Sequence, residues 1–232
     1  MNVAVIIPAL NEAENIGRVL AEIPRELVSS IYVADNGSTD GTRAIAKEMG
    51  AIVVEAPIKG YGFACLAALE NLPPQVDTIA FLDADGADCP RQLAELLEPI
   101  ETGEAELVIG SRVRGNREPG AMSWHALFGN RLATFFIRLL YRAEVTDLGP
   151  FRTVRRDALE ALEMEAAAFQ WTTEMIVKAA RLNYRIVEIP TDYRRRGGKS
   201  KISGTLQGSV RAAIGILGTV FRFVSWGPKA RQ

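Results

Sequence analysis

The sequence has little of what small secreted proteins rely on for stability. It contains two cysteines, Cys65 and Cys89, among 232 residues, and their spacing matches no metal-binding motif. Nothing in the sequence requires a disulfide. We therefore expect both thiols to be reduced, as in a cytoplasmic protein.

Long apolar runs are also absent. The longest stretch, residues 212–220, is followed closely by Arg222 and is too short to span a bilayer by itself. The N-terminus has no basic segment before its first apolar residues, and a polar residue, Asn11, soon follows. We therefore expect neither a signal peptide nor a transmembrane helix.

Acidic residues are missing from the C-terminal end of the chain. Residues 193–232 carry nine basic side chains and no acidic one, although the net charge of the whole protein is −1. An acidic body with a basic end predicts that the end meets phosphates, either in a ligand or on a membrane. So short a basic segment does not indicate a nucleic-acid partner.

The remaining sequence predicts a globular α/β protein. Apolar runs alternate with helical patterns, which is typical of a mostly parallel sheet flanked by helices. Strands are predicted near residues 3–7, 31–34, 52–55, 78–82, 107–109, 151–154 and 185–189. Helices are predicted near residues 13–23, 42–49, 62–71, 90–100, 124–141, 172–182 and 205–226, with Asn11 and Glu14 capping the first. We divide the chain into a catalytic domain, residues 1–203, and a basic amphipathic tail, residues 204–232.

Polar residues follow three of the predicted strands, where open α/β sheets bind their ligands. These segments are residues 8–12, 35–41 and 83–86. Asp35 can accept a hydrogen bond from a base N–H. Equally, residues 35–41 can simply turn the chain and cap a helix, because Asn, Gly, Ser and Asp do so routinely.

The sharpest chemical signal is the pair Asp83 and Asp85. The two carboxylates lie two residues apart at the end of an apolar strand and point to the same side. They repel each other unless a cation lies beside them. A hard oxygen environment of this kind favours Mg²⁺ or Mn²⁺.

Four segments together resemble the family 2 glycosyltransferases. They are residues 7–12, 35–42, 83–85 and 110–112, and the resemblance extends over about residues 1–204. It implies the GT-A fold and transfer of a sugar from a nucleotide-sugar with inversion at the anomeric carbon. Within the family, the chain looks most like the dolichyl-phosphate and polyprenyl-phosphate sugar synthases.

The resemblance also implies the donor site. Asp83 and Asp85 would hold the metal, with Asp85 its principal ligand and Asp83 also near the ribose and diphosphate. The implied nucleotide-binding residues are Pro8, Leu10, Asn11, Glu12, Asp35, Asn36, Asp83 and Ala84. Two departures stand out: Asn36 replaces the second Asp of the usual Asp-Asp-Gly-Ser, and residues 86–87 replace a Leu-Gln pair whose Gln assists at the metal. Asp88 or water would substitute for that Gln.

The second half of the chain supplies candidates for stabilising the departing diphosphate. They are Arg112, Arg131, Arg195 and Lys201, the last two within residues 195–201, which resemble the family's R-x-x-G-x-S-K loop. Asp147 and Glu174 are the acidic candidates for catalysis. A hydroxyl acceptor would need Glu174 as a general base, whereas an ionised phosphate acceptor needs none.

The leading hypothesis is a metal-dependent glycosyltransferase that moves a sugar from a UDP- or GDP-sugar to a polyprenyl phosphate at the cytoplasmic membrane face. One alternative is the same chemistry on a hydroxyl acceptor such as a glycolipid, glycan or metabolite. Another is a non-catalytic nucleotide-sugar binding protein. The tail has two readings of equal weight, a helix lying on a membrane surface or a helix packed on the domain or on a second subunit.

Overall fold

The computed structural model describes residues 1–165, 168, 170–197 and 206–227. Seven strands form one sheet: β1 (Val3–Ala9), β2 (Ser30–Asp35), β3 (Ile52–Glu55), β4 (Thr78–Phe81), β5 (Leu107–Ser111), β6 (Arg152–Arg155) and β7 (Ile186–Pro190). Their order is β3-β2-β1-β4-β6-β5-β7. β6 runs antiparallel to both of its neighbours and the other pairs are parallel. The predicted mostly parallel α/β fold is confirmed.

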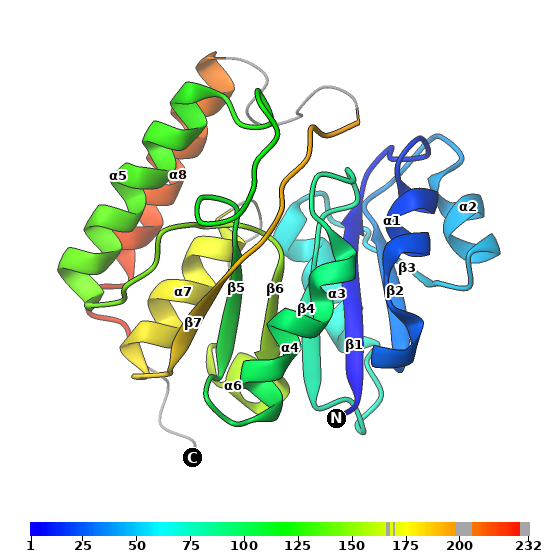
Figure 1. Cartoon of the computed structure of the whole chain (residues 1–232), viewed down its shortest axis with the longest axis horizontal. Coiled ribbons are helices and arrows are strands. Elements are labelled where there is room, and N and C mark those ends of the chain that lie inside the picture. The colour runs from blue at the N-terminus through cyan, green and yellow to red at the C-terminus, as the bar shows by residue number, and fades with distance from the viewer. Residues whose placement is uncertain (166–167, 169, 198–205, 228–232) are drawn as a thin grey trace.

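Helices cover both faces of the sheet (Figure 1). One face carries α1 (Ile16–Glu22), α2 (Thr42–Glu48) and α4 (Leu93–Glu101). The other carries α3 (Tyr61–Glu70), α5 (Trp124–Tyr141), α6 (Arg156–Ala161), α7 (Trp171–Arg181) and α8 (Leu206–Arg222). Short 3₁₀ helices occupy Arg25–Leu27 and Pro90–Gln92.

The sequence of β1 explains why both faces are covered. Val3, Val5 and Ile7 belong to one core cluster, while Ala4 and Ile6 belong to the other. Successive side chains of a strand point to opposite faces, so an uninterrupted apolar strand needs helices on both sides.

α8 packs against α5 and α7, as one reading of the tail anticipated. Val220 and Phe223 are buried in the core cluster on that face, and the ring of Phe221 lies 5.3 Å from that of Phe136 on α5. The outer side of the helix pair is exposed, with Phe128 at 63% and Ile214 at 68%. Within the described part of the chain, no helix is both long and apolar enough to cross a membrane.

The predicted capping box at the first helix is wrong. The helix begins at Ile16, after Asn15, and no side-chain cap is present. Asn11 has a positive φ of 50°, and its Oδ1 accepts a hydrogen bond from Thr39 N at 2.8 Å. The side chain therefore ties two loops together instead of capping a helix.

Candidate functional site

A cavity of about 410 Å³ opens at the carboxyl edge of the sheet, beyond the ends of β1, β2 and β4. Its lining comes from the three loops that were predicted from the sequence, from the start of α3 and from the segment after β7. The residues are Pro8, Ala9, Leu10, Glu12, Asn36, Lys59, Gly60, Tyr61, Ala64, Asp83, Ala84, Asp85, Arg196 and Gly197. A larger hollow of about 820 Å³ lies at the opposite edge and contains none of the predicted motifs. We therefore place the site in the smaller cavity.

Asp35 is buried behind this cavity rather than in its lining. Its Oδ2 accepts hydrogen bonds from Arg43 Nε at 2.6 Å and from Ser38 N at 3.1 Å. Burial alone would raise the pKa of Asp35, but the hydrogen bonds from Ser38 and Arg43 outweigh it and hold the pKa below its ordinary value. The carboxylate is thus ionised and organises the turn after β2.

The hydrogen bonds of Asn36 explain why this position is not the aspartate of the usual family motif. Its Nδ2 donates to the carbonyl oxygens of Ala56 at 3.3 Å and Ile58 at 2.8 Å, and its Oδ1 accepts from Gly60 N at 2.7 Å. An aspartate could accept the last bond but could not donate the first two. Asn36 therefore fixes residues 56–60, which place Lys59 in the cavity wall.

Asp83 and Asp85 both line the cavity. Oδ1 of Asp83 is buried and has no hydrogen-bond partner among the described residues. Burial, and then the charge of Asp85, raise the pKa of Asp83 to about 7. Burial, and then the charges of Asp83 and Asp85, likewise raise the pKa of Asp88 to about 8. Such crowding is costly without a cation, so the site fits a divalent metal.

The described residues contain no group of three or more His, Cys, Asp or Glu side chains arranged to hold a metal ion. Asp88 does not line the cavity, and its Oδ2 accepts a long hydrogen bond, 3.4 Å, from Asp83 N. The chain thus offers an aspartate pair rather than a closed cage. A cation here would keep positions for substrate phosphate and water, which is the usual environment of Mg²⁺.

Arg196 is one of the two basic cavity residues, with Lys59, that the sequence did not single out. Its Nη1 lies 3.1 Å from Asp85 Oδ2, and its Nη2 donates to the hydroxyl of Tyr193 at 3.2 Å. Arg195, which the family pattern favoured, points elsewhere: its Nε donates to the carbonyl oxygen of Pro119 at 2.7 Å. Neighbouring residues of an extended segment face opposite ways, so only one of them reaches the cavity.

Gly197 completes the contact between this segment and the cavity. Its N–H donates to the carbonyl oxygen of Asp85 at 3.2 Å, and its own carbonyl accepts from Asn15 Nδ2 at 3.1 Å. A Cβ at position 197 would lie 1.9 Å from Asn15 Oδ1, so a larger residue there would displace the Asn15 side chain and its hydrogen bond. The other predicted loop residues, Ser200 and Lys201, lie outside the described residues.

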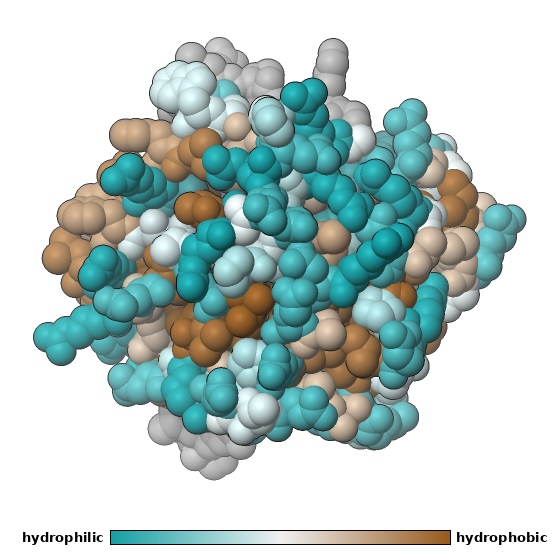
Figure 2. All heavy atoms as spheres, viewed as in Figure 1, coloured by the Kyte–Doolittle hydropathy of each residue, from teal (hydrophilic) through white to brown (hydrophobic). Residues whose placement is uncertain are grey.

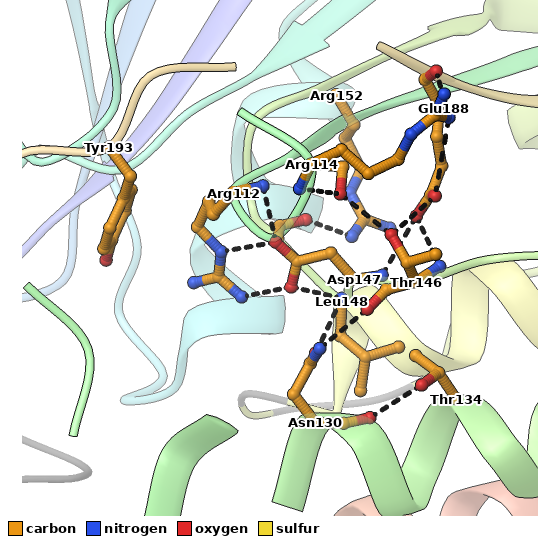
Figure 3. A network of polar contacts seen from close by, with 12 residues as sticks. Arg112, Arg114, Asn130, Thr134, Thr146, Asp147, Leu148, Arg152, Glu188 and Tyr193 are labelled. Atoms are coloured by element: carbon orange, nitrogen blue, oxygen red, sulfur yellow. Dashed lines mark hydrogen bonds and ion pairs between the residues drawn. The ribbon is translucent and has the colours of Figure 1, made fainter. Parts of the chain in front are cut away.

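Arg112 is held by Asp147 at the end of β5 (Figure 3). Asp147 Oδ2 accepts from Arg112 N and Nε, both at 2.8 Å, and Oδ1 accepts from Nη2 at 2.6 Å. Asp147 is fully buried, while the Arg112 side chain is 14% exposed. The guanidinium lies 5.1 Å from the ring centre of Tyr193, and its charge offsets part of the rise in the pKa of Asp83 and Asp88 that burial causes. The pair presents a fixed cation next to the acidic cluster.

Comparison with known proteins identifies the family. Residues 4–163 match the model of the family described as glycosyl transferase family 2. The chain belongs to glycosyltransferase family 2. A relative from Mycobacterium tuberculosis, described as an uncharacterized glycosyltransferase, is 38% identical over 91% of this chain and 94% of its own. This family 2 protein is therefore a glycosyltransferase.

Two further relatives carry more specific names. The polyprenol monophosphomannose synthase of Mycolicibacterium smegmatis is 30% identical over 98% of this glycosyltransferase and 87% of its own chain. The undecaprenyl-phosphate mannosyltransferase of Micrococcus luteus is 31% identical over 100% and 96%. Among solved structures, glucosyl-3-phosphoglycerate synthase from Mycobacterium tuberculosis, in complex with Mn²⁺, UDP and phosphoglyceric acid, gives a TM-score of 0.78. It is 22% identical, covers 98% of this chain and 80% of its own, and so supports the GT-A fold alone.

The glycosyltransferase does not bring Glu174 or Arg131 to the cavity. Glu174 is fully buried on α7, where its Oε1 lies 2.7 Å from Nζ of the equally buried Lys178. Lys178 in turn lies 4.8 Å from the ring centres of Phe223 and Trp226. This ion pair sits beneath the C-terminal segment, and Arg131 is exposed on α5.

Proposed function

We propose that this enzyme transfers a sugar from a UDP- or GDP-sugar to a polyprenyl phosphate, with inversion at the anomeric carbon. The observation that carries the proposal is the juxtaposition of Asp83 and Asp85 with Arg196 in one cavity, and of Arg112 beside it. A carboxylate pair suits a metal bound to a diphosphate, and the arginines suit phosphate oxygens. The names of the mycobacterial and Micrococcus relatives support the lipid-phosphate acceptor.

In this proposal, Asp83 and Asp85 hold Mg²⁺ or Mn²⁺. The metal would supply electrophilic stabilisation of the diphosphate, and the relative solved with Mn²⁺ and UDP supports that expectation. Pro8, Leu10 and Glu12 would line the nucleotide subsite.

Arg196 offsets the charge of Asp85, and its guanidinium would be available to a phosphate oxygen when Asp85 is engaged by the metal. Lys201 and Arg195 remain proposed members of the loop that covers the diphosphate.

The environment of the acidic residues favours a phosphate acceptor over a hydroxyl. The two carboxylates proposed for catalysis, Asp147 and Glu174, are each paired with a buried or nearly buried cation, Arg112 and Lys178. A carboxylate engaged in this way is a poor general base. A phosphate monoester is largely ionised at neutral pH and needs no base to become a nucleophile.

The outer side of α5 and α8 supports contact with the membrane that holds such a lipid. Exposed apolar residues on it include Trp124, Phe128, Phe135 and Leu139, and Figure 2 shows apolar residues gathered at the margin where α5 lies. Neither helix contains an acidic residue, and Arg131 is exposed on α5. Arg138 and Arg222 are exposed as well, and each pairs with a glutamate of another segment, Glu144 and Glu165. Apolar and basic side chains on one face suit an anionic membrane surface.

One assay tests the proposal. The purified protein is incubated with Mn²⁺ or Mg²⁺, a panel of UDP- and GDP-sugars, and a short polyprenyl phosphate in detergent. We expect labelled sugar to enter the organic phase with one donor and to stay in the aqueous phase with Asp85→Ala. Metal-dependent donor hydrolysis without lipid product would indicate that the acceptor is a hydroxyl compound. Donor binding without turnover on any acceptor would point to a binding protein instead.

A further inference from the structure

The segment of residues 146–149, just before β6, is held by buried side chains from α5, β5, β6 and β7 (Figure 3). Glu188 on β7 accepts the backbone N–H groups of Thr146 at 2.7 Å and Asp147 at 2.9 Å through its Oε1. Asn130 on α5 donates to the carbonyl of Thr146 at 2.8 Å and accepts from Leu148 N at 3.0 Å.

Two further contacts complete this arrangement. Glu188 Oε2 accepts from the hydroxyl of Thr146 at 2.8 Å, and that hydroxyl lies 2.9 Å from Ser111 Oγ. Arg152 on β6 donates to the carbonyl oxygen of Gly149. Side chains thus satisfy the backbone hydrogen-bonding groups of this short segment, as a neighbouring strand would in a sheet. The backbone therefore has little freedom to shift.

The segment delivers one side chain toward the site, the carboxylate of Asp147, which grips Arg112. The grip uses Nε and Nη2 of the guanidinium. Within the described residues, Nη1 has no hydrogen bond, so it remains for a ligand. A planar cation held on one edge in this way presents its other edge in a fixed direction, as recognition of a phosphate requires.

We propose that Glu188 and Asn130 are positioning residues that set the direction of Arg112 through the 146–149 segment, so that Arg112 binds a substrate phosphate. The inference rests on the proposed function, because it takes Arg112 as a phosphate-binding residue. The phosphate belongs either to the donor diphosphate or to the lipid acceptor. Glu188 makes no contact with Arg112 itself; its effect passes through the peptide groups of Thr146 and Asp147.

The charges in this region argue for a role beyond filling the core. Glu188 and Asp147 are two carboxylates with side chains 4% and 0% exposed, and they share one short segment. Arg114 Nη1 lies 4.0 Å from Glu188 Oε2, which is a weak contact, whereas Arg112 has a bidentate contact with Asp147. Burying two like charges to satisfy a loop is expensive, and an apolar loop packing would avoid the cost. The need to hold Arg112 rigidly would explain why both buried carboxylates are kept.

A double-mutant cycle between Glu188→Ala and Arg112→Ala tests this relay. We expect Glu188→Ala to lower kcat/KM by about 10- to 100-fold, the range found when a residue that orients a metal ligand is lost. In the Arg112→Ala background, the same change should lower kcat/KM by less than about 2-fold, because the group it positions is already gone. Losses that multiply in the double variant would overturn the proposal, since a general structural defect acts independently of Arg112.

Two further variants separate a specific effect on Arg112 from a general loss of stability. Glu106→Gln is the matched control: Glu106 is also largely buried and pairs with an arginine, Arg185, but it lies at the opposite edge of the sheet. Its effect on kcat/KM should be small and should combine with Arg112→Ala multiplicatively. If Glu188→Ala does not fold, as judged by thermal melting, Glu188→Gln replaces it in the cycle with a smaller expected loss, because the amide oxygen can still accept from the backbone N–H groups. A folded Glu188 variant with wild-type kcat/KM would refute the role.

The cycle is run separately on metal-dependent donor hydrolysis and on transfer to polyprenyl phosphate. Non-additive losses in both arms would assign the Arg112 contact to the donor diphosphate. Losses confined to the KM of the lipid would assign it to the acceptor phosphate. If the wild type hydrolyses donor but makes no lipid product, the proposed acceptor fails while the hydrolysis arm still decides the role of Glu188.

Discussion

Replacing Asn36 with aspartate should disable the donor site without unfolding the protein. The change keeps the size of the side chain but removes both donated hydrogen bonds, to Ala56 O at 3.3 Å and Ile58 O at 2.8 Å. Each such bond contributes about 0.5–1.5 kcal/mol, and a carboxylate facing two carbonyl oxygens costs at least as much again. We therefore expect a penalty of about 3 kcal/mol, felt mainly by residues 56–60.

If donor binding needs these residues in place, the same free energy appears as a loss of donor affinity. About 1.4 kcal/mol corresponds to a factor of ten, so the dissociation constant of the nucleotide-sugar should rise about 100-fold. Isothermal titration with the donor and Mn²⁺ measures this directly. A wild-type dissociation constant in a folded Asn36→Asp protein would refute the argument from these hydrogen bonds.

Lowering the pH should partly restore binding in this variant. A carboxylate crowded by two carbonyl oxygens has a raised pKa, and its protonated form can donate one hydrogen bond. The ratio of variant to wild-type dissociation constants should therefore shrink between pH 7.5 and pH 5. Asn71→Asp is the matched control, because Asn71 also donates to a carbonyl, that of Ala67 at 2.8 Å, but on the exposed end of α3. It should change neither donor affinity nor pH response.

Three further outcomes follow from the buried charges and the exposed helix face. Because the pKa of Asp83 is about 7 in the folded state, against an ordinary 3.8, the folded protein binds an extra proton between about pH 4 and pH 7. Without added metal, the free energy of unfolding in urea should therefore fall as pH rises through that window, and Asp83→Asn should flatten the decline. Lys178→Met leaves Glu174 buried without its cation and should lower the free energy of unfolding by about 3–5 kcal/mol, whereas changing both residues to apolar ones should recover much of it. Phe128→Glu should abolish co-sedimentation with phosphatidylglycerol vesicles, whereas Ile52→Glu, exposed on β3, should not; equal binding by both variants would remove α5 from the membrane contact.

The sequence was most informative where local signals and tertiary packing agree. The helix predicted for residues 124–141 has those bounds because Ser123 caps it, its Oγ accepting from Ala126 N at 3.4 Å, and because Arg142 ends it with a φ of 58°. The strands were predicted from uninterrupted apolar runs, and their ends located the cavity. The six-residue helix α6 was missed, since so short an element carries less than two turns of periodicity.

Long-range contacts set the limits of prediction at the site. Nothing local indicates that the amide of Asn36 bonds to residues 56–60, or that Asn11 bonds to Thr39. The run of arginines at 194–196 predicted a basic loop. Only the path of the backbone determines that Arg196 enters the cavity while Arg194 pairs with Glu22. Glu188 carried no signal at all, because its partners are peptide groups some forty residues earlier.

The reversed direction of β6 has a consequence for how such an enzyme can diversify. Because β6 runs against its neighbours, the chain enters it at the edge where the other strands leave. The connection from α5, residues 142–151, therefore reaches that edge, where Asp147 holds Arg112 beside the cavity. Because this connection belongs to no strand, substitutions of its exposed side chains can change the surroundings of the site while the pairing of every strand stays as it is, so substrate preference and sheet architecture can evolve separately.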